Sequence, residues 1–229
     1  MPNLELLDRN AHGALKMSQP RGAGRSFIQI VPDEIVEASA RAPVFFTKDK
    51  DSGHFYVGVM LGFKEGENLL QDNAGRMPGF VPLDLVRGGF YISGEHIAID
   101  REDARFTLDE GDLLFGADGE PSERLRYVQH VLGRVERGIR ESDRFIAAMM
   151  ELHLLEPIQI SLKFDDGETI ALRGLYTVSL DQLQDLDDLQ VLALFRSGDL
   201  RLAYAIAQSL RQVPVLAEQR NRRLGDLAV

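Results

Sequence analysis

The sequence predicts an α+β fold, in which a largely antiparallel sheet of hairpins packs against a long central helix, with a helical C-terminal region. Three observations predict it: an amphipathic segment from Pro121 toward Leu154, hairpin patterns at 44–63 and 158–172, and helical spacing of apolar residues after Gly198. The helix stripe and the hairpin faces each need an apolar partner, so we expect them to cover each other. We expect a single domain over residues 1–229, with a β-rich lobe at 1–120 and a second lobe at 121–229 that carries the long helix, a hairpin and the C-terminal helices.

The long helix is predicted by apolar residues that recur at alternating spacings of three and four, with only position 142 given to a polar residue. These residues are Leu125, Val128, Leu132, Val135, Ile139, Ile146 and Met149. Ser122 is the expected N-cap, and Glu123 favours the positive end of the helix dipole. The pattern predicts one buried stripe.

Two segments alternate with the period of a strand. Ile158, Ile160, Leu162 and Phe164 alternate with polar residues, and 165–167 (Asp-Asp-Gly) is typical of a turn before Thr169–Leu172. Val44–Lys48 and Phe55–Phe63 likewise flank a polar loop at 49–53. Gly58 and Gly62 share one face of this hairpin, where either another element of the chain or a ligand can approach the backbone.

The remaining segments are less regular. Residues 1–25 contain Gly13, Pro20, Gly22 and Gly24 and favour an extended arm. Phe27–Val31 is a short strand, and Asp33 is the expected cap of a helix that continues to about Ala40. From 66 to 119 we expect short strands and turns, with an acidic run at 100–120 that is either solvated surface or a site for a cation or basic partner.

At the C-terminal end, the apolar residues after Ser179 predict short helices. Gly198 breaks the pattern, and Asp199 is the expected cap of the last helix. Residues 220–229 are basic, and we expect them to form a frayed tail.

Composition limits the function. The chain of 229 residues carries a net charge of −10, which argues against a nucleic-acid surface. It has no cysteine, which excludes disulfides and thiolate chemistry. The N-terminus lacks the apolar core of a signal peptide, and no apolar run approaches the roughly 20 residues of a membrane span. We therefore expect a soluble, acidic, cytoplasmic protein.

The search for catalytic or metal-binding motifs finds none. The five histidines are His12, His54, His96, His130 and His153, and no two have a short ligand spacing. Nucleophile elbows and phosphate-binding glycine loops are absent from the sequence. We expect neither a bound metal nor a cofactor, and an enzyme has no motif to support it.

Several segments, taken in order, resemble the bacterial SapC family. They are Pro43-Val-Phe-Phe-Thr-Lys48, Gly66-Glu-Asn-Leu69, Gly79-Phe-Val-Pro82, Leu113-Leu-Phe-Gly-Ala-Asp-Gly-Glu-Pro121, Leu154-Leu-Glu-Pro157, Gly174-Leu-Tyr-Thr-Val178 and the final helix with Tyr204, Ser209 and Leu210. Arg87-Gly-Gly-Phe90 departs from the family pattern, which favours a Tyr-Pro-Phe type of sequence there.

The resemblance implies a link to a surface-layer protein, from which the family takes its name, and hence surface association. It also implies relatives encoded near tryptophan-halogenase-like flavoproteins and outer-membrane receptors. It does not extend to the like-named transport permease, and it carries no catalytic residues.

Two classes of function follow. The first is a non-enzymatic binding or accessory protein for surface-layer assembly or for a neighbouring amino-acid-modifying flavoenzyme. The second is a small enzyme whose polar groups converge only in the fold, with Glu67, Asn68, His54 and Tyr176 as candidates. We expect binding of a protein or small-molecule ligand near Glu67, Asn68 and the 79–82 segment, on loops held by a rigid scaffold. An oligomer is compatible with both classes.

Overall fold

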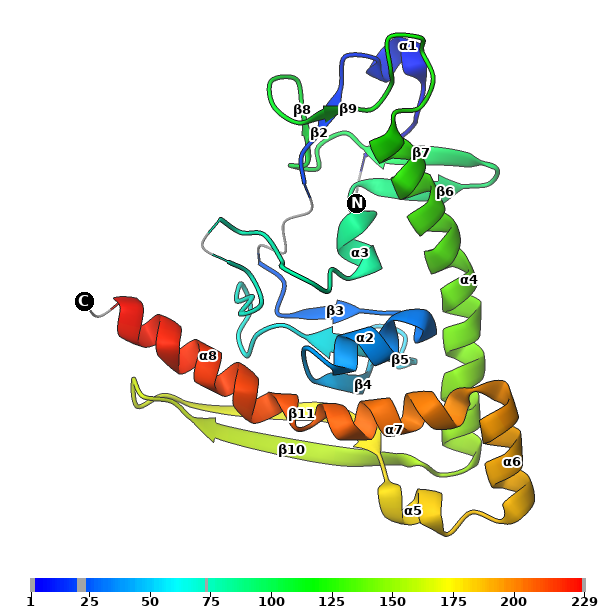
Figure 1. The fold of residues 1–229 in the computed structure, drawn as a ribbon, viewed down its shortest axis with the longest axis vertical. Helices are drawn as coiled ribbons and strands as arrows, with labels where there is room; N and C mark the ends of the chain where they lie inside the picture. The colour runs from blue at the N-terminus through cyan, green and yellow to red at the C-terminus, as the bar shows by residue number, and fades with distance from the viewer. Residues whose placement is uncertain (1–2, 20–23, 73, 228–229) are drawn as a thin grey trace. The chain divides into compact units, whose positions relative to one another are not determined.

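The computed structural model describes residues 3–19, 24–72 and 74–227, with side chains to residue 225. The chain divides into two compact units, and each unit is made of two stretches of sequence (Figure 1). Unit 1 comprises Met1–Gly22 and Leu83–Arg137, and unit 2 comprises Ala23–Pro82 and Gly138–Val229. These boundaries differ from the predicted division at residue 120, and the single domain stays a prediction.

Unit 2 is built on an antiparallel sheet, as predicted. Among the described residues this sheet has five strands in the order β10-β11-β4-β5-β3. Their bounds are Leu155–Lys163 for β10, Thr169–Val178 for β11, Val44–Lys48 for β4, Phe55–Met60 for β5 and Phe27–Gln29 for β3. The two predicted hairpins are joined where β11 pairs with β4, at Leu175↔Thr47 and Tyr176↔Phe46.

Both faces of this sheet are covered by helices. Successive residues of a strand point to opposite faces. Phe46 stacks on Phe145 of the long helix α4 (Glu123–Glu151), with 5.8 Å between ring centroids. Its neighbour Phe45 belongs instead to a buried cluster with Val213 and Leu216 of the last helix, α8 (Gln212–Leu227). The predicted packing of the long helix on the sheet is therefore confirmed, and α8 adds a second layer that the sequence did not predict.

Helix α4 starts as predicted, because the Ser122 hydroxyl accepts a hydrogen bond from the Leu125 N–H at 3.2 Å. Its stripe differs in the middle, where Ile139 is 47% exposed. A Cβ added to the neighbouring Gly138 would lie 2.5 Å from Val31, so backbone and side chain approach closely there. The α4 residues at this contact, Gly138 and Ser142, are small. Ser142 is buried, and its hydroxyl is satisfied by donating to the Gly138 carbonyl at 2.9 Å. The close approach leaves no room for Ile139 inside the stripe.

Unit 1 has a core of its own, to which the first half of α4 contributes Leu125, Val128 and Leu132. The described residues form two small sheets here, β1-β7-β6 and β8-β2-β9. The strands are β1 (Leu4–Leu6), β2 (Lys16–Met17), β6 (Phe90–Ser93), β7 (His96–Asp100), β8 (Phe106–Thr107) and β9 (Asp112–Leu113), with short helices α1 (Arg9–His12) and α3 (Leu83–Val86). Most acidic residues between 100 and 120 are exposed.

The predicted extended arm at 1–25 is wrong for its described part. Strand β1 pairs with β7, and α1 is capped by the Asp8 side chain. Leu15 and Met17 are buried in the core of unit 1, so their two apolar side chains anchor a segment whose composition is otherwise polar. Pro20 and Gly22 lie outside the described residues.

The predicted cap at Asp33 is also wrong. Asp33 lies within the 3-10 turn η1 (Pro32–Glu34), which leads into α2 (Ile35–Ser39). The capping carboxylate belongs to the buried Glu34, which accepts the Val31 N–H at 3.0 Å. The turn begins at Pro32, and the capping carboxylate is that of Glu34, one residue after the predicted Asp33.

Three more helices follow the sheet: α5 (Leu180–Gln184), α6 (Asp188–Ser197) and α7 (Asp199–Ser209). Gly198 ends α6 with a φ of +84°, as its position predicts. Asp199 is the first residue of α7 and not its cap. Its buried carboxylate accepts two hydrogen bonds from the Arg144 guanidinium, at 2.7 and 3.0 Å, and so ties α7 to α4.

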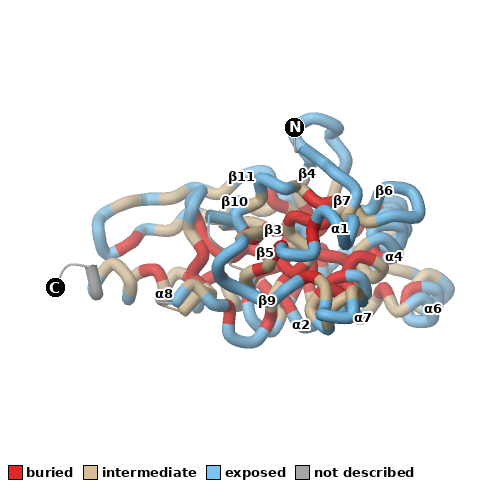
Figure 2. Tube along the Cα trace, turned by 90° about the horizontal axis from the view of Figure 1, so that it is seen from above, coloured by how far each residue is buried: buried red, intermediate tan, exposed pale blue. Residues whose placement is uncertain are grey.

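Residues 220–227 continue α8 and are not a frayed tail. Arg220 is buried, in a helix along which buried, intermediate and exposed residues alternate (Figure 2). Its guanidinium lies 4.1 Å from the Phe164 ring centroid and pairs with Glu168 at 2.7 Å and with Glu67 at 3.2 Å. The composition of this segment is typical of a solvated tail, but the charge of Arg220 is partly neutralised inside the fold by Glu67 and Glu168.

Candidate functional site

The four predicted site residues lie in two places in unit 2. His54 is exposed in the loop between β4 and β5, and Tyr176 lies on β11 with its ring 5.0 Å from that of Phe55. Glu67 and Asn68 lie in the loop that follows β5 and approach α8 through Arg220 and Arg223. Asn68 directly precedes Leu69, which lines the cavity described below.

Glu67 and Asn68 shape that loop. The Glu67 carboxylate accepts the Phe63 N–H at 2.7 Å. The buried Asn68 accepts the Leu70 N–H at 3.0 Å through its side-chain oxygen. Both interactions satisfy backbone donors of an irregular segment, which would otherwise be costly to bury.

The two glycines of the β4–β5 hairpin are filled by the chain itself. A Cβ on Gly58 would lie 2.2 Å from the Phe27 ring, and one on Gly62 would lie 2.4 Å from the Glu67 carbonyl oxygen. The structure therefore favours packing, and not ligand approach, as the reason for both glycines.

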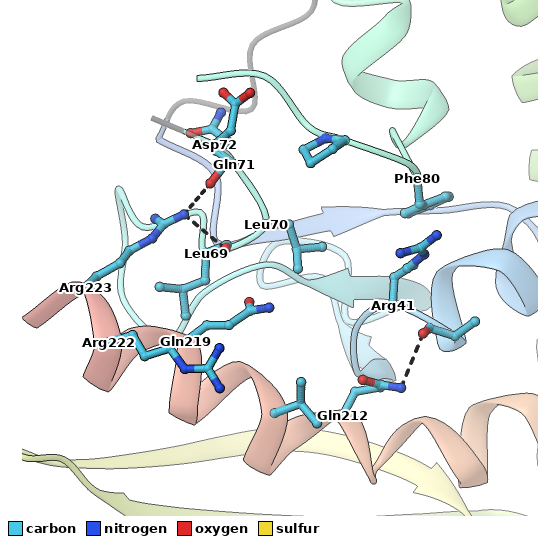
Figure 3. A pocket seen from close by; sticks show the side chains of 13 residues that line it. Arg41, Leu69, Leu70, Gln71, Asp72, Phe80, Gln212, Gln219, Arg222 and Arg223 are labelled. Atoms are coloured by element: carbon cyan, nitrogen blue, oxygen red, sulfur yellow. Dashed lines mark hydrogen bonds between the residues drawn. The ribbon is translucent and has the colours of Figure 1, made fainter. Parts of the chain in front are cut away.

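Arg223 of α8 fixes the loop from the other side. Its guanidinium donates to the carbonyl oxygens of Asn68 at 2.7 Å, Leu69 at 3.0 Å and Gln71 at 2.5 Å. Two of these three hydrogen bonds are drawn in Figure 3. One side chain thus holds three carbonyl groups of the loop against the helix.

A cavity of about 510 Å³ opens between this loop, the end of α2 and α8 (Figure 3). Its lining is Ala40, Arg41, Leu69, Leu70, Gln71, Asp72, Pro78, Phe80, Gln212, Val215, Gln219, Arg222 and Arg223. The volume is in the range of pockets that hold small molecules. The two segments that the sequence suggested adjoin this lining. Glu67–Asn68 directly precedes Leu69–Asp72, and 79–82 follows Pro78 and contains Phe80.

Helix α8 serves the core and the cavity with different faces. Val213, Leu216 and Arg220 are buried, whereas Gln212, Val215, Gln219 and Arg222 recur at spacings of three, four and three and line the cavity. Packing of the buried face against the core therefore positions the row of residues that lines the cavity.

The cavity is positively charged. Asp72 is the one acidic residue in its described lining, and its carboxylate is already paired with the Arg76 guanidinium at 2.8 Å. Hydrogen bonds, above all from the Arg76 backbone N–H, hold the pKa of Asp72 below its usual range. Asp72 is therefore ionised near neutral pH, and its negative charge is compensated by Arg76, which is not part of the cavity lining.

The cavity's own arginines lack such compensation. Within the described residues the Arg41 guanidinium has no hydrogen-bonding or ionic partner, and the Arg223 guanidinium has carbonyl partners only. Arg222 is 3.6 Å from Glu218, a contact between two exposed side chains that screens little charge. Three guanidinium groups thus face one opening in a chain whose net charge is −10.

Two amide groups in the lining have unused hydrogen-bonding capacity. The side-chain nitrogen of Gln71 and the side-chain oxygen of Gln219 are buried without a hydrogen-bond partner in the described structure. Leaving a buried polar atom unpaired costs about 1–3 kcal/mol. Both atoms are enclosed by the protein, so their unmet hydrogen bonds are a cost to the fold.

Sequence reasoning missed the α8 side of this cavity. Arg222 and Arg223 fall within 220–229, the segment that was interpreted as a tail, and Gln219 lies directly before that segment's first residue. The apolar spacing Val213, Leu216, Arg220 and Leu224 could have revealed the helix if the aliphatic part of the arginine had been counted as apolar.

Two negative findings limit the chemistry. Across the described ranges no group of three or more histidine or acidic side chains is arranged to hold a metal ion. None of the helices described is both long and apolar enough to cross a membrane. The expectation of a metal-free protein stays a prediction.

The fold and the site together define an α+β protein with a basic cavity of ligand size. The chain belongs to the SapC family, because the family model described as SapC matches residues 7–216. No curated protein and no solved structure matches the chain. The match ends within α8, so the cavity residues Gln219, Arg222 and Arg223 lie beyond it.

Proposed function

We propose that this protein is a non-enzymatic binding or accessory protein that holds a small anionic ligand in the cavity beside α8. The observation that carries the proposal is the set of three arginines around one opening, where the lining carboxylate of Asp72 is paired with Arg76 and Arg222 has only a 3.6 Å contact with the exposed Glu218. A guanidinium group binds carboxylate or phosphate oxygens in a forked geometry, which suits recognition of such an anion.

The ligand combines its anionic group with an apolar part. Leu69, Leu70, Phe80 and Val215 line the same cavity as the arginines. Apolar walls with a few placed polar groups are typical of small-molecule sites.

Binding is favoured over catalysis by the chemistry of the lining. Arginine and glutamine side chains neither gain nor lose protons near neutral pH, and Asp72 is held ionised by its hydrogen bonds. General acid–base catalysis needs a group whose pKa lies near the working pH. The alternative of a small enzyme would need residues outside this cavity.

The cellular role that we propose follows the family. The SapC name supports an accessory role in surface-layer assembly, or beside an amino-acid-modifying flavoenzyme, with the anion as the molecule that is carried or sensed. Glu67 and Asn68 contribute by holding the wall formed by Leu69–Asp72, while a role for His54 and Tyr176 stays a prediction.

Isothermal titration calorimetry with benzoate, acetate and benzylamine tests the proposal. Benzoate supplies an anion and a ring, acetate lacks the ring, and benzylamine reverses the charge. We expect benzoate to bind most tightly and benzylamine not at all. Equal binding of benzoate and benzylamine would contradict an anion site.

A variant pair locates the site. Arg41→Ala with Arg222→Ala removes two cavity cations, both on exposed residues, and should weaken benzoate binding at least tenfold. Arg211→Ala is the matched control, since Arg211 is exposed next to α8 but does not line the cavity. Circular dichroism confirms that both variants are folded. Unchanged binding in the double variant places the anion elsewhere.

Glu67→Ala with Asn68→Ala tests the predicted residues directly. The double variant leaves the Phe63 and Leu70 N–H groups without their acceptors, which should lower the free energy of unfolding by about 2 kcal/mol and weaken benzoate binding. Lost stability with unchanged binding per folded molecule would mean that the pair is purely structural.

A further inference from the structure

Helix α6 (Asp188–Ser197) presents an uncovered apolar face. Leu189 is 78% exposed, Phe195 70% and Leu192 41%, although such large apolar side chains are usually buried. Leu194 is buried on the opposite side of the helix, so α6 already packs on its own unit and the exposed face is turned outward. Figure 2 shows exposed residues along this helix.

Exposed apolar residues that gather on one helix face mark an interaction surface. The helix is short, but it is well formed: the Asp187 side chain caps it and Gly198 ends it with a left-handed turn. The surface is therefore held in a fixed geometry by residues that lie outside it.

The charges at the two ends of α6 are opposite. Asp188 lies in its first turn and Arg196 in its last, both exposed. Neither has a hydrogen-bonding or ionic side-chain partner within the described residues. The two residues flank Leu192, each four positions away from it.

The apolar and charged residues of α6 complement those of a second copy of the helix that runs in the opposite direction. If two copies of α6 pair antiparallel about Leu192, then Leu192 meets Leu192 of the second copy and Leu189 meets Phe195. The same pairing brings Asp188 opposite Arg196 of the second copy, twice. A two-fold interface requires this relation, since one patch must complement itself.

We propose that the exposed face of α6 is the contact of a homodimer in which two copies of this helix pack antiparallel. The charge pattern favours a second copy over an unrelated partner, because apolar and ionic contacts are both satisfied by the same register. A single pair of helices of this length buries little area, so we expect a weak dimer with a dissociation constant on the order of 10–100 μM.

Sedimentation velocity of the full chain over a concentration series tests the dimer. Asp188→Arg and Arg196→Asp each place like charges together and should weaken association at least tenfold. The combined variant Asp188→Arg with Arg196→Asp restores opposite charges across the same axis and should associate within about threefold of the parent chain. A merely structural effect of either substitution would not be rescued by the second.

Crosslinking gives an independent measurement, since the natural chain has no cysteine. Leu192→Cys places one thiol beside the two-fold axis, and a short bismaleimide should convert it to a covalent dimer. Ser161→Cys is the control, because Ser161 is exposed on β10, away from this face in the fold, and should give no dimer. A chain that stays monomeric throughout the series without crosslinking at 192 overturns the proposal, as does a dimer that all charge variants leave unchanged.

Discussion

Arg220 and Arg222 are two residues apart on α8 and face different surroundings. Arg220 is buried against the Phe164 ring and paired with Glu67 and Glu168. Arg222 is exposed at the cavity and has one long contact, with Glu218. The charge of Arg220 is therefore committed to the fold by its acidic partners, whereas the charge of Arg222 is largely uncompensated at the cavity.

The largest effect is expected from the apolar residue of the buried face. Leu216 is 2% exposed in the sheet core and its neighbour Val215 is 45% exposed at the cavity. Leu216→Ala should lower the free energy of unfolding by about 2–5 kcal/mol, since it leaves a cavity in the core. Val215→Ala, measured in the same urea titration, should change it by less than about 0.5 kcal/mol. Similar losses at both positions would show that α8 has no distinct faces.

The second effect concerns the two arginines themselves. Arg220→Met keeps the apolar volume but leaves Glu67 without its cation, and should cost about 3 kcal/mol of unfolding free energy. Arg222→Met should leave stability within about 0.5 kcal/mol and weaken benzoate binding instead. A stable Arg220→Met protein would mean that the buried ion pairs contribute nothing net.

A smaller effect is expected from acid. Hydrogen bonds from Lys64, and then from Arg220, hold the pKa of Glu168 below its usual range. A carboxylate with a lowered folded-state pKa stabilises the fold above its unfolded pKa, and this contribution is lost as the pH falls through the folded value. Urea midpoints measured from about pH 7 to about pH 3 should therefore fall less steeply for Glu168→Gln than for the parent chain. Parallel curves would show that these contacts do not persist in solution.

The smallest effect on stability is expected at Gln219. Its side-chain oxygen is buried without a partner, so Gln219→Leu should leave stability unchanged or raise it by about 0.5–1 kcal/mol. The same change should leave benzoate binding within about twofold, because benzoate has no hydrogen-bond donor for this oxygen. If Gln219→Leu destabilises the protein instead, the amide serves the fold and belongs with Arg220 in the comparison.

Regular periodicity made much of this fold predictable. The alternation at 158–164 and the cap at Ser122 led to β10 and α4 because one local pattern decided each. Ile139 was misplaced because the close approach of Val31 to Gly138, more than a hundred residues apart in sequence, decides which face is buried. No window of sequence contains that contact.

The cavity was predictable only in part. Its loop wall adjoins Asn68 and the 79–82 segment, which the sequence indicated, but Arg41, Asp72 and Arg222 come from three separate stretches of the chain. Charge alone predicts a solvated surface at Arg222 and Arg220 alike. What separates them is the set of acidic partners that the β10–β11 hairpin and the Glu67 loop bring to one of the two.

The pairing of β11 with β4 sets the order of events during synthesis. Phe46 pairs with Tyr176, so one edge of β4 stays open until about 130 further residues have left the ribosome. At translation rates of roughly 5–20 residues per second, that wait is on the order of ten seconds. During it the strand carrying Phe45 and Phe46 presents unpaired backbone groups and apolar side chains, the combination that promotes aggregation. The nascent chain therefore exposes an unpaired apolar strand during this interval, and slowing its translation between residues 60 and 170 should lower its yield.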